Sequence, residues 1–250
     1  MRLNSIKNLL LFLFLFKLVL NDPTVTLPSH DSTPIYGNGE EIIKVELDSD
    51  ASFQDYFRVK FNLQEPTNRN PAIIISTDKG GNDRLFTSLQ LYDEIYIFLR
   101  KKQIAEGPFY IVIKNRENFN VTDYTIEISN QDKAYLPFNK QTSYYISDDE
   151  FNNITEFVFQ KDGSESTDIT FWAQGKSIYN TNMDGFTSGK FDSTYTTYTY
   201  YGPIPTEEDN FTLEVNSVKG DYITVGSVTL NDKLVYNGLK ENRNEILVAS

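Results

Sequence analysis

Acidic side chains are the most abundant groups in this chain that could do acid–base or metal chemistry. Its 250 residues include 35 Asp and Glu against 23 Lys and Arg, with a single histidine and no cysteine. Disulfides, thiolate metal sites, Cys-His pairs and multi-histidine metal sites are therefore excluded. His30 lies in a proline-containing entry segment, where we predict a solvated linker residue rather than a member of a Ser-His-Asp triad.

Carboxylates alone are enough for one class of enzyme, because a glycosidase needs only two of them across a cleft. A sequence does not reveal such a pairing. Alternation with apolar neighbours instead places Glu46, Glu127 and Glu214 on solvated strand faces. The phosphate-binding patterns GxxxxGK[ST] and GxGxxG do not occur in the chain. We therefore expect no enzymatic activity.

Calcium is the metal that these residues could hold, through carboxylate, amide and carbonyl oxygens. Two acidic loops are candidates, neither with the spacing of an EF-hand. The first loop offers Asp78, Asn82 and Asp83, and the second offers Asp148, Asp149 and Glu150. Ordinary turn chemistry is the favoured explanation of both loops, so we expect no obligatory cofactor and keep calcium as an alternative.

A row of tyrosines is the candidate ligand-binding site. Four of them, Tyr195, Tyr198, Tyr200 and Tyr201, lie in the run 195–201. On a strand, an exposed row of flat rings could stack on sugars or anchor a protein partner. Ordinary cross-strand packing of Tyr and Thr is the alternative. We predict that Trp172, in a nearby apolar run, belongs to the core.

Three Asn-X-Ser/Thr sequences lie in or beside predicted turns, at Asn120, Asn153 and Asn210. About three are expected by chance in a chain this rich in Asn, Ser and Thr. Their exposed positions suit N-glycosylation in a secretory pathway.

The first 21 residues have the pattern of a secretion signal. Arg2 and Lys7 precede eight consecutive Leu and Phe residues, 9–16, a run too short for a comfortable membrane span. Residues around position 21 make a weak cleavage site, so an uncleaved signal anchor is the alternative. Removing 1–21 takes away three basic residues and no acid, leaving 20 against 35, a net charge of −15. That charge disfavours binding to nucleic acid.

Period-two alternation predicts strands through most of the remaining chain. Six are expected in the first half, at 43–47, 57–61, 72–75, 95–99, 109–113 and 124–128. The segment 72–75 is apolar throughout, which suits a strand buried on both faces. Gly, Pro, Asn and Asp turns separate the strands. Few stretches have a helical period, and 87–92 is the one candidate for a helix.

The second half repeats this plan at an offset near 100. The segment Phe109–Ile113 is matched by Phe211–Val215, and Asp123–Ile126 by Asp221–Thr224. We interpret this as an internal duplication. The predicted fold is all-β, with two tandem antiparallel β-sandwich domains after the signal peptide. The boundaries are 1–21 signal peptide, 22–39 extended entry, 40–130 first domain, 131–141 linker, 142–231 second domain and 232–250 polar tail.

The runs Asp93–Leu99, Gly107–Ile113 and Asp123–Ile128 resemble the strand motifs of the bacterial pre-peptidase C-terminal domain. The resemblance covers 40–130 well and 140–231 loosely. It implies a jelly-roll-like β-sandwich of the kind found beside secreted peptidases, where it assists folding, export or substrate binding, in some cases with calcium. Here 70–74 replaces the family's aspartate-rich strand and no peptidase domain is present. Neither calcium nor a peptidase partner is therefore carried over.

These observations favour a secreted or cell-surface, non-enzymatic protein that binds or adheres to an extracellular protein or glycan. Contact with a membrane is expected only if the signal segment stays uncleaved. Two alternatives remain open: a carbohydrate-active enzyme or its accessory sugar-binding module, and a structural spacer in a larger surface protein.

Overall fold

The computed structural model describes residues 22–63, 72–87, 94–104, 107–115, 123–138, 142–149, 153–161, 169–174, 177–179, 186–190, 195–200, 211–219, 222–230 and 233–237; in several strands of the second half it describes the backbone alone. These residues form strands almost throughout, with one short helix, α2 (Lys101–Ile104). The prediction of an all-β chain is confirmed. Within the described residues, no helix has the length and apolar character needed to cross a membrane.

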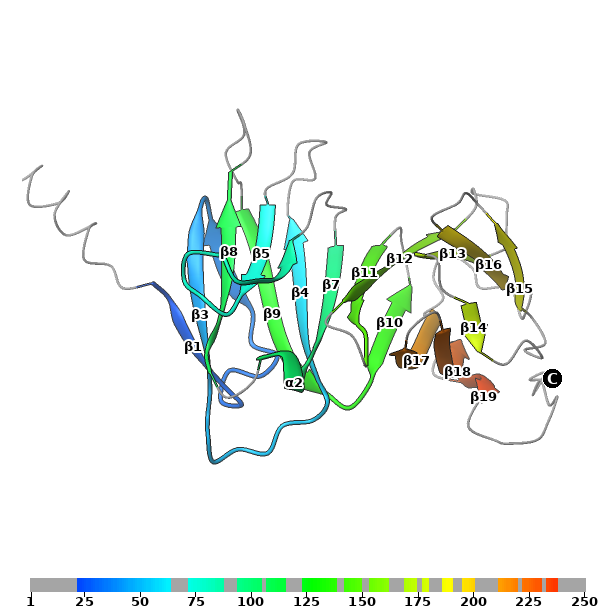
Figure 1. Ribbon diagram of the computed structural model, residues 1–250, viewed down its shortest axis with the longest axis horizontal. Helices are drawn as coiled ribbons and strands as arrows, with labels where there is room; N and C mark the ends of the chain where they lie inside the picture. The colour runs from blue at the N-terminus through cyan, green and yellow to red at the C-terminus, as the bar shows by residue number, and fades with distance from the viewer. Residues whose placement is uncertain are drawn as a thin grey trace, which may run out of the picture.

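The strands form three sheets, which we call A, B and C (Figure 1). Sheet A has the strand order β1 (Thr24–Leu27), β3 (Glu41–Leu47), β8 (Phe109–Lys114), β5 (Ala72–Ser76), β6 (Arg84–Thr87). Sheet C has the order β10 (Ala134–Phe138), β17 (Phe211–Lys219), β18 (Tyr222–Leu230), β14 (Ser177–Tyr179), with β19 (Lys233–Asn237) also paired to β18. All strands of sheet A come from the first half of the chain, and those of sheet C from the second half.

Sheet B contains nine strands and extends through both halves of the chain. Its order is β15 (Phe186–Lys190), β16 (Tyr195–Tyr200), β13 (Ile169–Gln174), β12 (Ile154–Lys161), β11 (Thr142–Ser147), β7 (Glu94–Arg100), β4 (Tyr56–Leu63), β9 (Asp123–Gln131), β2 (Ile35–Asn38). The halves meet where β11 pairs with β7, with Ser143 opposite Ile95 and Ile146 opposite Phe98. Their strands do not interleave, but they belong to one continuous sheet.

The six strands predicted in the first half are all present, as β3, β4, β5, β7, β8 and β9. The expectation of purely antiparallel sheets is corrected, because β1 with β3, β11 with β7 and β14 with β18 are parallel pairs. Tight turns enforce antiparallel pairing only between neighbouring strands. The strands of these three pairs are separated along the chain by at least one other strand, so turn signals in the sequence did not constrain them.

Two hydrophobic cores lie on opposite faces of sheet B. Successive residues of a strand point to opposite faces, and on β7 Ile95, Ile97 and Leu99 belong to the core against sheet A. Tyr96 and Phe98 of the same strand belong to the core against sheet C. Strands β7 and β11 are therefore buried on both faces, and Figure 1 shows sheet A at one end of the molecule and sheet C at the other.

Segments expected to be irregular contain strands. The entry segment 22–39 carries β1 and β2, with a cis peptide bond between Leu27 and Pro28. The predicted linker 131–141 contains β10, which pairs with β17, and the predicted polar tail contains β19. Each of these strands is short and lies near a sheet edge or beside one partner strand, so its own sequence pattern is weak.

Strand positions recur between the halves, whereas strand pairing does not. Strand β12 occupies 154–161, which is 98 residues after β4 at 56–63. In sheet B, β4 lies between β7 and β9, but β12 lies between β11 and β13. Equal spacing along the chain thus accompanies two different sheet connectivities.

Candidate ligand-binding face

The predicted tyrosine row lies in an interior strand of sheet B. Tyr195, Tyr198 and Tyr200 belong to β16, whose neighbours are β13 and β15; the backbone of Tyr198 pairs with Phe171 and Ser188. Their side chains and the whole of Tyr201 lie outside the described residues, as does the side chain of Trp172. Whether these tyrosine rings form a contact surface or pack against their neighbours thus stays a prediction.

The first acidic loop is closed by Asp78, between β5 and β6. Its carboxylate accepts hydrogen bonds from the backbone N–H of Gly80 at 2.7 Å, of Asn82 at 2.8 Å and of Asp83, and from the Ser76 hydroxyl. These bonds, chiefly that from the Asp83 N–H, lower the pKa of Asp78. Gly81 in the loop has a φ of +70°, which favours glycine. Both Asp78 oxygens are occupied by N–H donors, and turn chemistry accounts for the loop without a cation.

The second acidic loop lies at the junction of the two halves. Asp149 accepts a hydrogen bond from the Arg100 guanidinium, and Asp148 is buried. The third candidate, Glu150, lies outside the described residues. Within the described part of the chain, no group of three or more His, Cys, Asp or Glu side chains is placed to hold a metal ion.

One of the three glycosylation sequences lies within the described residues. Asn153 is exposed in the turn between β11 and β12, where its carbonyl accepts a hydrogen bond from the Asp148 N–H at 2.7 Å. Asn120 and Asn210 lie outside the described residues. His30 is half-buried in a turn after β1 rather than in a solvated linker. Its backbone N–H donates a hydrogen bond to the Thr26 carbonyl at 2.9 Å.

The described residues bring together a group of polar side chains that sequence reasoning did not combine. They lie on β2, β9, β4 and β7, on the face of sheet B that points away from sheet A. Alternation puts Phe57, Val59 and Phe61 in the core against sheet A, so the residues between them point outward. We call this surface the polar face and define it by Tyr36, Arg58, Lys60, Glu94, Thr125 and Glu127.

Strand register places these residues in two cross-strand rows. One row runs Tyr36, Thr125, Asn62 and Glu94, and the next runs Glu127, Lys60 and Tyr96. Neighbouring strands lie about 4.8 Å apart, so Tyr36 on β2 and Lys60 on β4 are separated by about 10 Å across the sheet. Positively charged donors and negatively charged acceptors thus lie beside one another across several strands.

The cations of the polar face gather around Tyr96. The Lys60 ammonium lies 5.7 Å and the Arg58 guanidinium carbon 5.9 Å from the centre of the Tyr96 ring, which are cation–π distances. Lys60 also forms an ion pair with Glu94 at 3.6 Å. Tyr96 donates to Glu94 at 3.3 Å, and burial, with the nearby Glu94 charge second, raises the pKa of Tyr96. Arg58 Nε is buried without a hydrogen-bond partner.

Sheet C limits the polar face on one side and the edge strand β2 limits it on the other. Beyond Tyr96 the rings of Tyr96 and Tyr144 stack at 5.1 Å, and residues of β17 and β10 cover them. At the opposite edge Tyr36 is 74% exposed, and it is the large hydrophobic residue that stands out as exposed among the described ones. The face therefore runs from buried aromatic packing to an open aromatic ring.

Alternation at 57–61 did predict that Arg58 and Lys60 point to one side, but no local pattern placed Tyr36 and Glu127 beside them. Pairing of β2 with β9 and of β9 with β4 joins segments up to about 90 residues apart. Glu214, predicted on a solvated face, is instead only 8% exposed. Its carboxylate accepts hydrogen bonds from the Lys133 ammonium at 2.5 Å and from the Ser227 hydroxyl at 2.8 Å. These bonds offset the free-energy cost of burying its charge.

Comparison with known proteins adds no assignment, since no protein-family model matches the chain and no curated protein matches its sequence.

Proposed function

We propose that this chain is an exported, non-enzymatic binding protein that contacts an extracellular partner through the polar face. In this proposal two β-sandwich units, one at each end, share the nine-stranded sheet B. The resemblance of 93–128 to pre-peptidase C-terminal domains supports a sandwich with a role outside the cell. The signal-like residues 1–21 and the acidic, cysteine-free composition agree with it.

The observation that carries the proposal is the composition of the polar face. Besides the exposed Tyr36, its residues are partly exposed hydrogen-bonding or charged groups, and they lie on strands that pack against a core on their other side. A rigid sheet can hold a ligand without paying to order a loop. A structural spacer needs no such surface. Binding through the polar face would therefore favour a binding protein over a structural spacer.

The contacts at the N-terminal end of the described structure fit the proposed cleavage. Strand β1 begins at Thr24, and its residues Val25 and Leu27 are buried in the core against sheet A. Lys44 donates its N–H to the Pro23 carbonyl at 2.9 Å, and Lys79 pairs with Asp22 at 2.5 Å. Cleavage before Asp22 would leave all of these contacts intact.

Export is tested by expressing the full chain in a secreting cell. We expect most of the product in the medium, with an N-terminus between Asn21 and Thr24 by intact mass. Full-length protein that begins at Met1 in the soluble cytosol would refute export, and with it the use of the glycosylation sequences.

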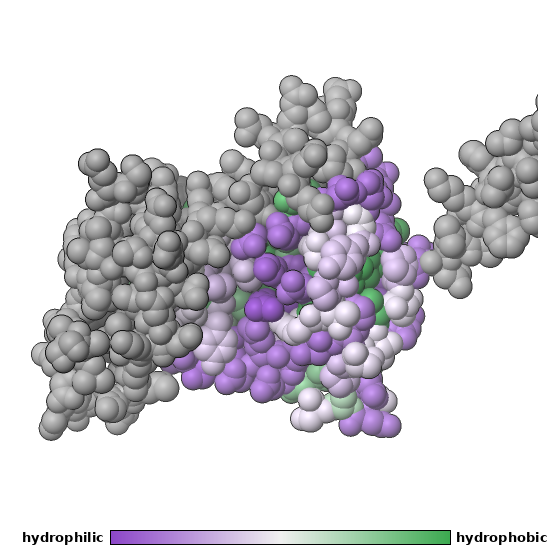
Figure 2. Space-filling view, turned by 180° about the vertical axis from the view of Figure 1, so that it is seen from behind, coloured by the Kyte–Doolittle hydropathy of each residue, from purple (hydrophilic) through white to green (hydrophobic). Residues whose placement is uncertain are grey.

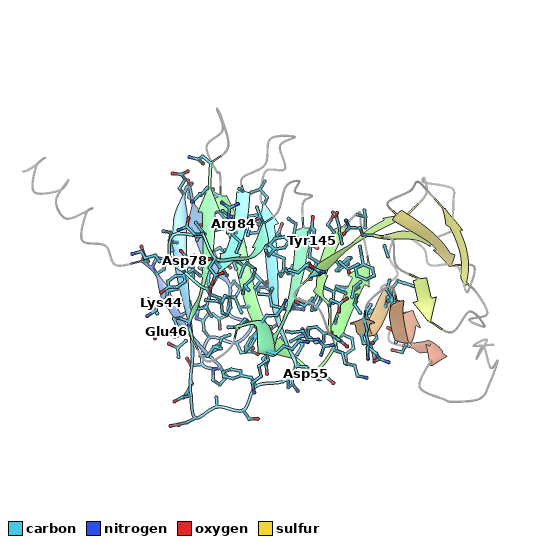
Figure 3. All side chains as sticks on the ribbon, viewed as in Figure 1. Lys44, Glu46, Asp55, Asp78, Arg84 and Tyr145 are labelled. Carbon is cyan, nitrogen blue, oxygen red and sulfur yellow. The ribbon has the colours of Figure 1, made fainter. Side chains whose placement is uncertain are left out.

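Binding is tested with the secreted product, labelled and presented in multivalent form to animal, fungal and bacterial cell surfaces. We expect saturable binding that Lys60→Ala weakens about tenfold, since an ion-paired cation on the face is lost. Lys44→Ala is the matched control, because Lys44 also pairs with a glutamate, Glu46, but lies on the outer face of sheet A (Figure 3). Absence of saturable binding, or equal loss in both variants, would overturn the proposal.

A further inference from the structure

We propose that the ligand of the polar face is an uncharged, hydroxyl-rich carbohydrate chain, with Tyr36 as its stacking platform. This inference rests on the proposed binding function and names its ligand class. Three observations on the described residues carry it: the exposure of Tyr36, the presence of both donors and acceptors beside it, and the mixture of charge signs on the face.

Tyr36 offers a flat apolar surface in an otherwise polar setting. Its side chain is 74% exposed on the edge strand β2, while Ile35 on the same strand packs against the core. An aromatic ring held on a strand presents a large surface with little loss of side-chain freedom on binding. The apolar face of a sugar ring is a ligand surface of matching shape, and its edge carries the hydroxyl groups.

The rows beside Tyr36 supply both kinds of hydrogen-bonding group. Thr125 lies directly opposite Tyr36 and both donates and accepts, whereas Lys60 donates and Glu127 opposite it accepts. Sugar hydroxyls also donate and accept, so each can pair with either kind of neighbour. The separation of about 10 Å between Tyr36 and Lys60 across the sheet is longer than one sugar ring, which favours a chain over a single sugar.

Charge on the face argues against a polyanion or polycation. Charges of both signs lie on the face, since the cations Arg58 and Lys60 are accompanied by the anions Glu94 and Glu127 and, in the row beyond Thr125, by Asp123. Lys60 is already paired with Glu94. A strongly charged ligand of either sign would lie against side chains of its own charge and be repelled by them. The mature chain, at −15, would further repel a polyanion.

The same surface is poorly suited to a protein partner. Protein interfaces concentrate binding energy in clusters of buried apolar and aromatic residues, and the polar face exposes a single large ring. Figure 2 shows one side of the molecule, where hydrophilic residues predominate on the described surface and hydrophobic residues show in separate patches.

Calorimetry of the secreted protein with three kinds of soluble polysaccharide tests the inference. The probes are neutral hexose polymers, a neutral N-acetylhexosamine polymer and heparin as the polyanion. We expect binding to at least one neutral polymer, not to heparin. Tyr36→Ala should weaken it about tenfold or more, and Tyr36→Phe should retain it. Tyr110→Ala, on the outer face of sheet A, is the matched control and should leave it unchanged. Thermal melting verifies that each variant folds.

The cell-surface assay separates failure of this inference from failure of the binding function. Periodate oxidises the vicinal diols of sugars, and a protease removes proteins. Binding that periodate abolishes and protease spares supports the carbohydrate ligand. Binding that persists after periodate and is lost after protease, or that Tyr36→Ala does not change, overturns it while the binding function stands. No binding to any surface or polymer refutes both.

Discussion

Arg100, at the end of β7, contacts groups from two other segments of the chain. Its guanidinium bonds Asp149 beyond β11, lies 3.8 Å from Asp55 before β4, and stacks over the Tyr56 ring at 4.1 Å. The Arg100 side chain is 14% exposed, whereas that of Asp55 is 75% exposed. Burial raises the pKa of Tyr56 to about 12, so this ring stays neutral beside the cation. Arg100 thus links the first half of sheet B to the second.

Removing this cation should destabilise the fold. We expect Arg100→Ala to lower the free energy of unfolding by about 3 kcal/mol, because Asp149 loses the cation that compensates its partial burial. Asp55→Asn is the control and should cost less than about 1 kcal/mol, since an exposed ion pair contributes little. Urea unfolding followed by circular dichroism measures both. Equal effects would mean that the Asp149 pair is no stronger than a surface pair.

Asp78 should make stability depend on pH in the acid range. Its folded-state pKa is lowered by backbone hydrogen bonds, so its contribution is fully present above the unfolded-state pKa of about 3.9 and is lost as pH falls further. The melting temperature of the wild type should therefore exceed that of Asp78→Asn at pH 6, and the gap should narrow below about pH 4.

The same two proteins discriminate between a turn and a calcium site in this loop. If Asp78 only closes the turn, calcium and EDTA leave both melting temperatures unchanged. A wild-type melting temperature that rises with calcium and falls with EDTA would show that the loop binds calcium.

At the scale of elements, the edge strand β2 is fitted to its neighbour by one glycine. A Cβ at Gly37 would overlap the ring of Tyr124, which is buried on β9 and donates to Glu41 at 2.5 Å. Burial raises the pKa of Tyr124 above its ordinary value, so it acts as a neutral donor. The absence of a side chain at Gly37 therefore lets β2 lie against β9 and present Tyr36 outward.

Gly37→Ala should displace β2. We expect a loss of about 1 to 3 kcal/mol in unfolding free energy, the usual range for overpacking. The variant should also bind the carbohydrate of the polar face more weakly, because Tyr36 moves with β2. Gly107→Ala is the control, since a Cβ there meets nothing within 4 Å, and its effect should stay within about 0.5 kcal/mol. If both variants melt alike, β2 can shift without cost.

Sequence patterns were sufficient for six strands of the first half and insufficient for β1, β2 and β6 beside them. Alternating or continuous apolar residues at 43–47 and 95–99 depend only on local spacing, and both segments are strands. The segment Thr142–Ser147 is buried at every position, yet half of it is Ser or Thr, so its composition gave no sign of this. Its burial comes from sheets A and C, most strands of which are contributed by distant segments.

For the whole molecule, the sharing of β7 and β11 between two cores means that the ends of the molecule should unfold together. We expect Ile97→Ala, in the core against sheet A, to cost about 2 to 5 kcal/mol. The single tryptophan, Trp172, lies on β13 in the second half and reports on the other end. Its fluorescence transition in urea should shift by the same amount as the circular dichroism. An unshifted fluorescence transition would show that the ends unfold independently.

The strand pairs of this molecule differ in how far apart along the chain their paired residues lie. Tyr56 of β4 pairs with Gln131 of β9, whereas Ser147 of β11 pairs with Ile154 of β12, a few residues away. Loop closure between distant residues is slow, and pairing of near neighbours is fast. During refolding, the hairpins around β11–β12 and β17–β18 should therefore form early. Closure of β4 onto β9 in the first half and of β10 onto β17 in the second should set the overall rate, so each end of the molecule reaches its native pairing only after segments synthesised far apart have met.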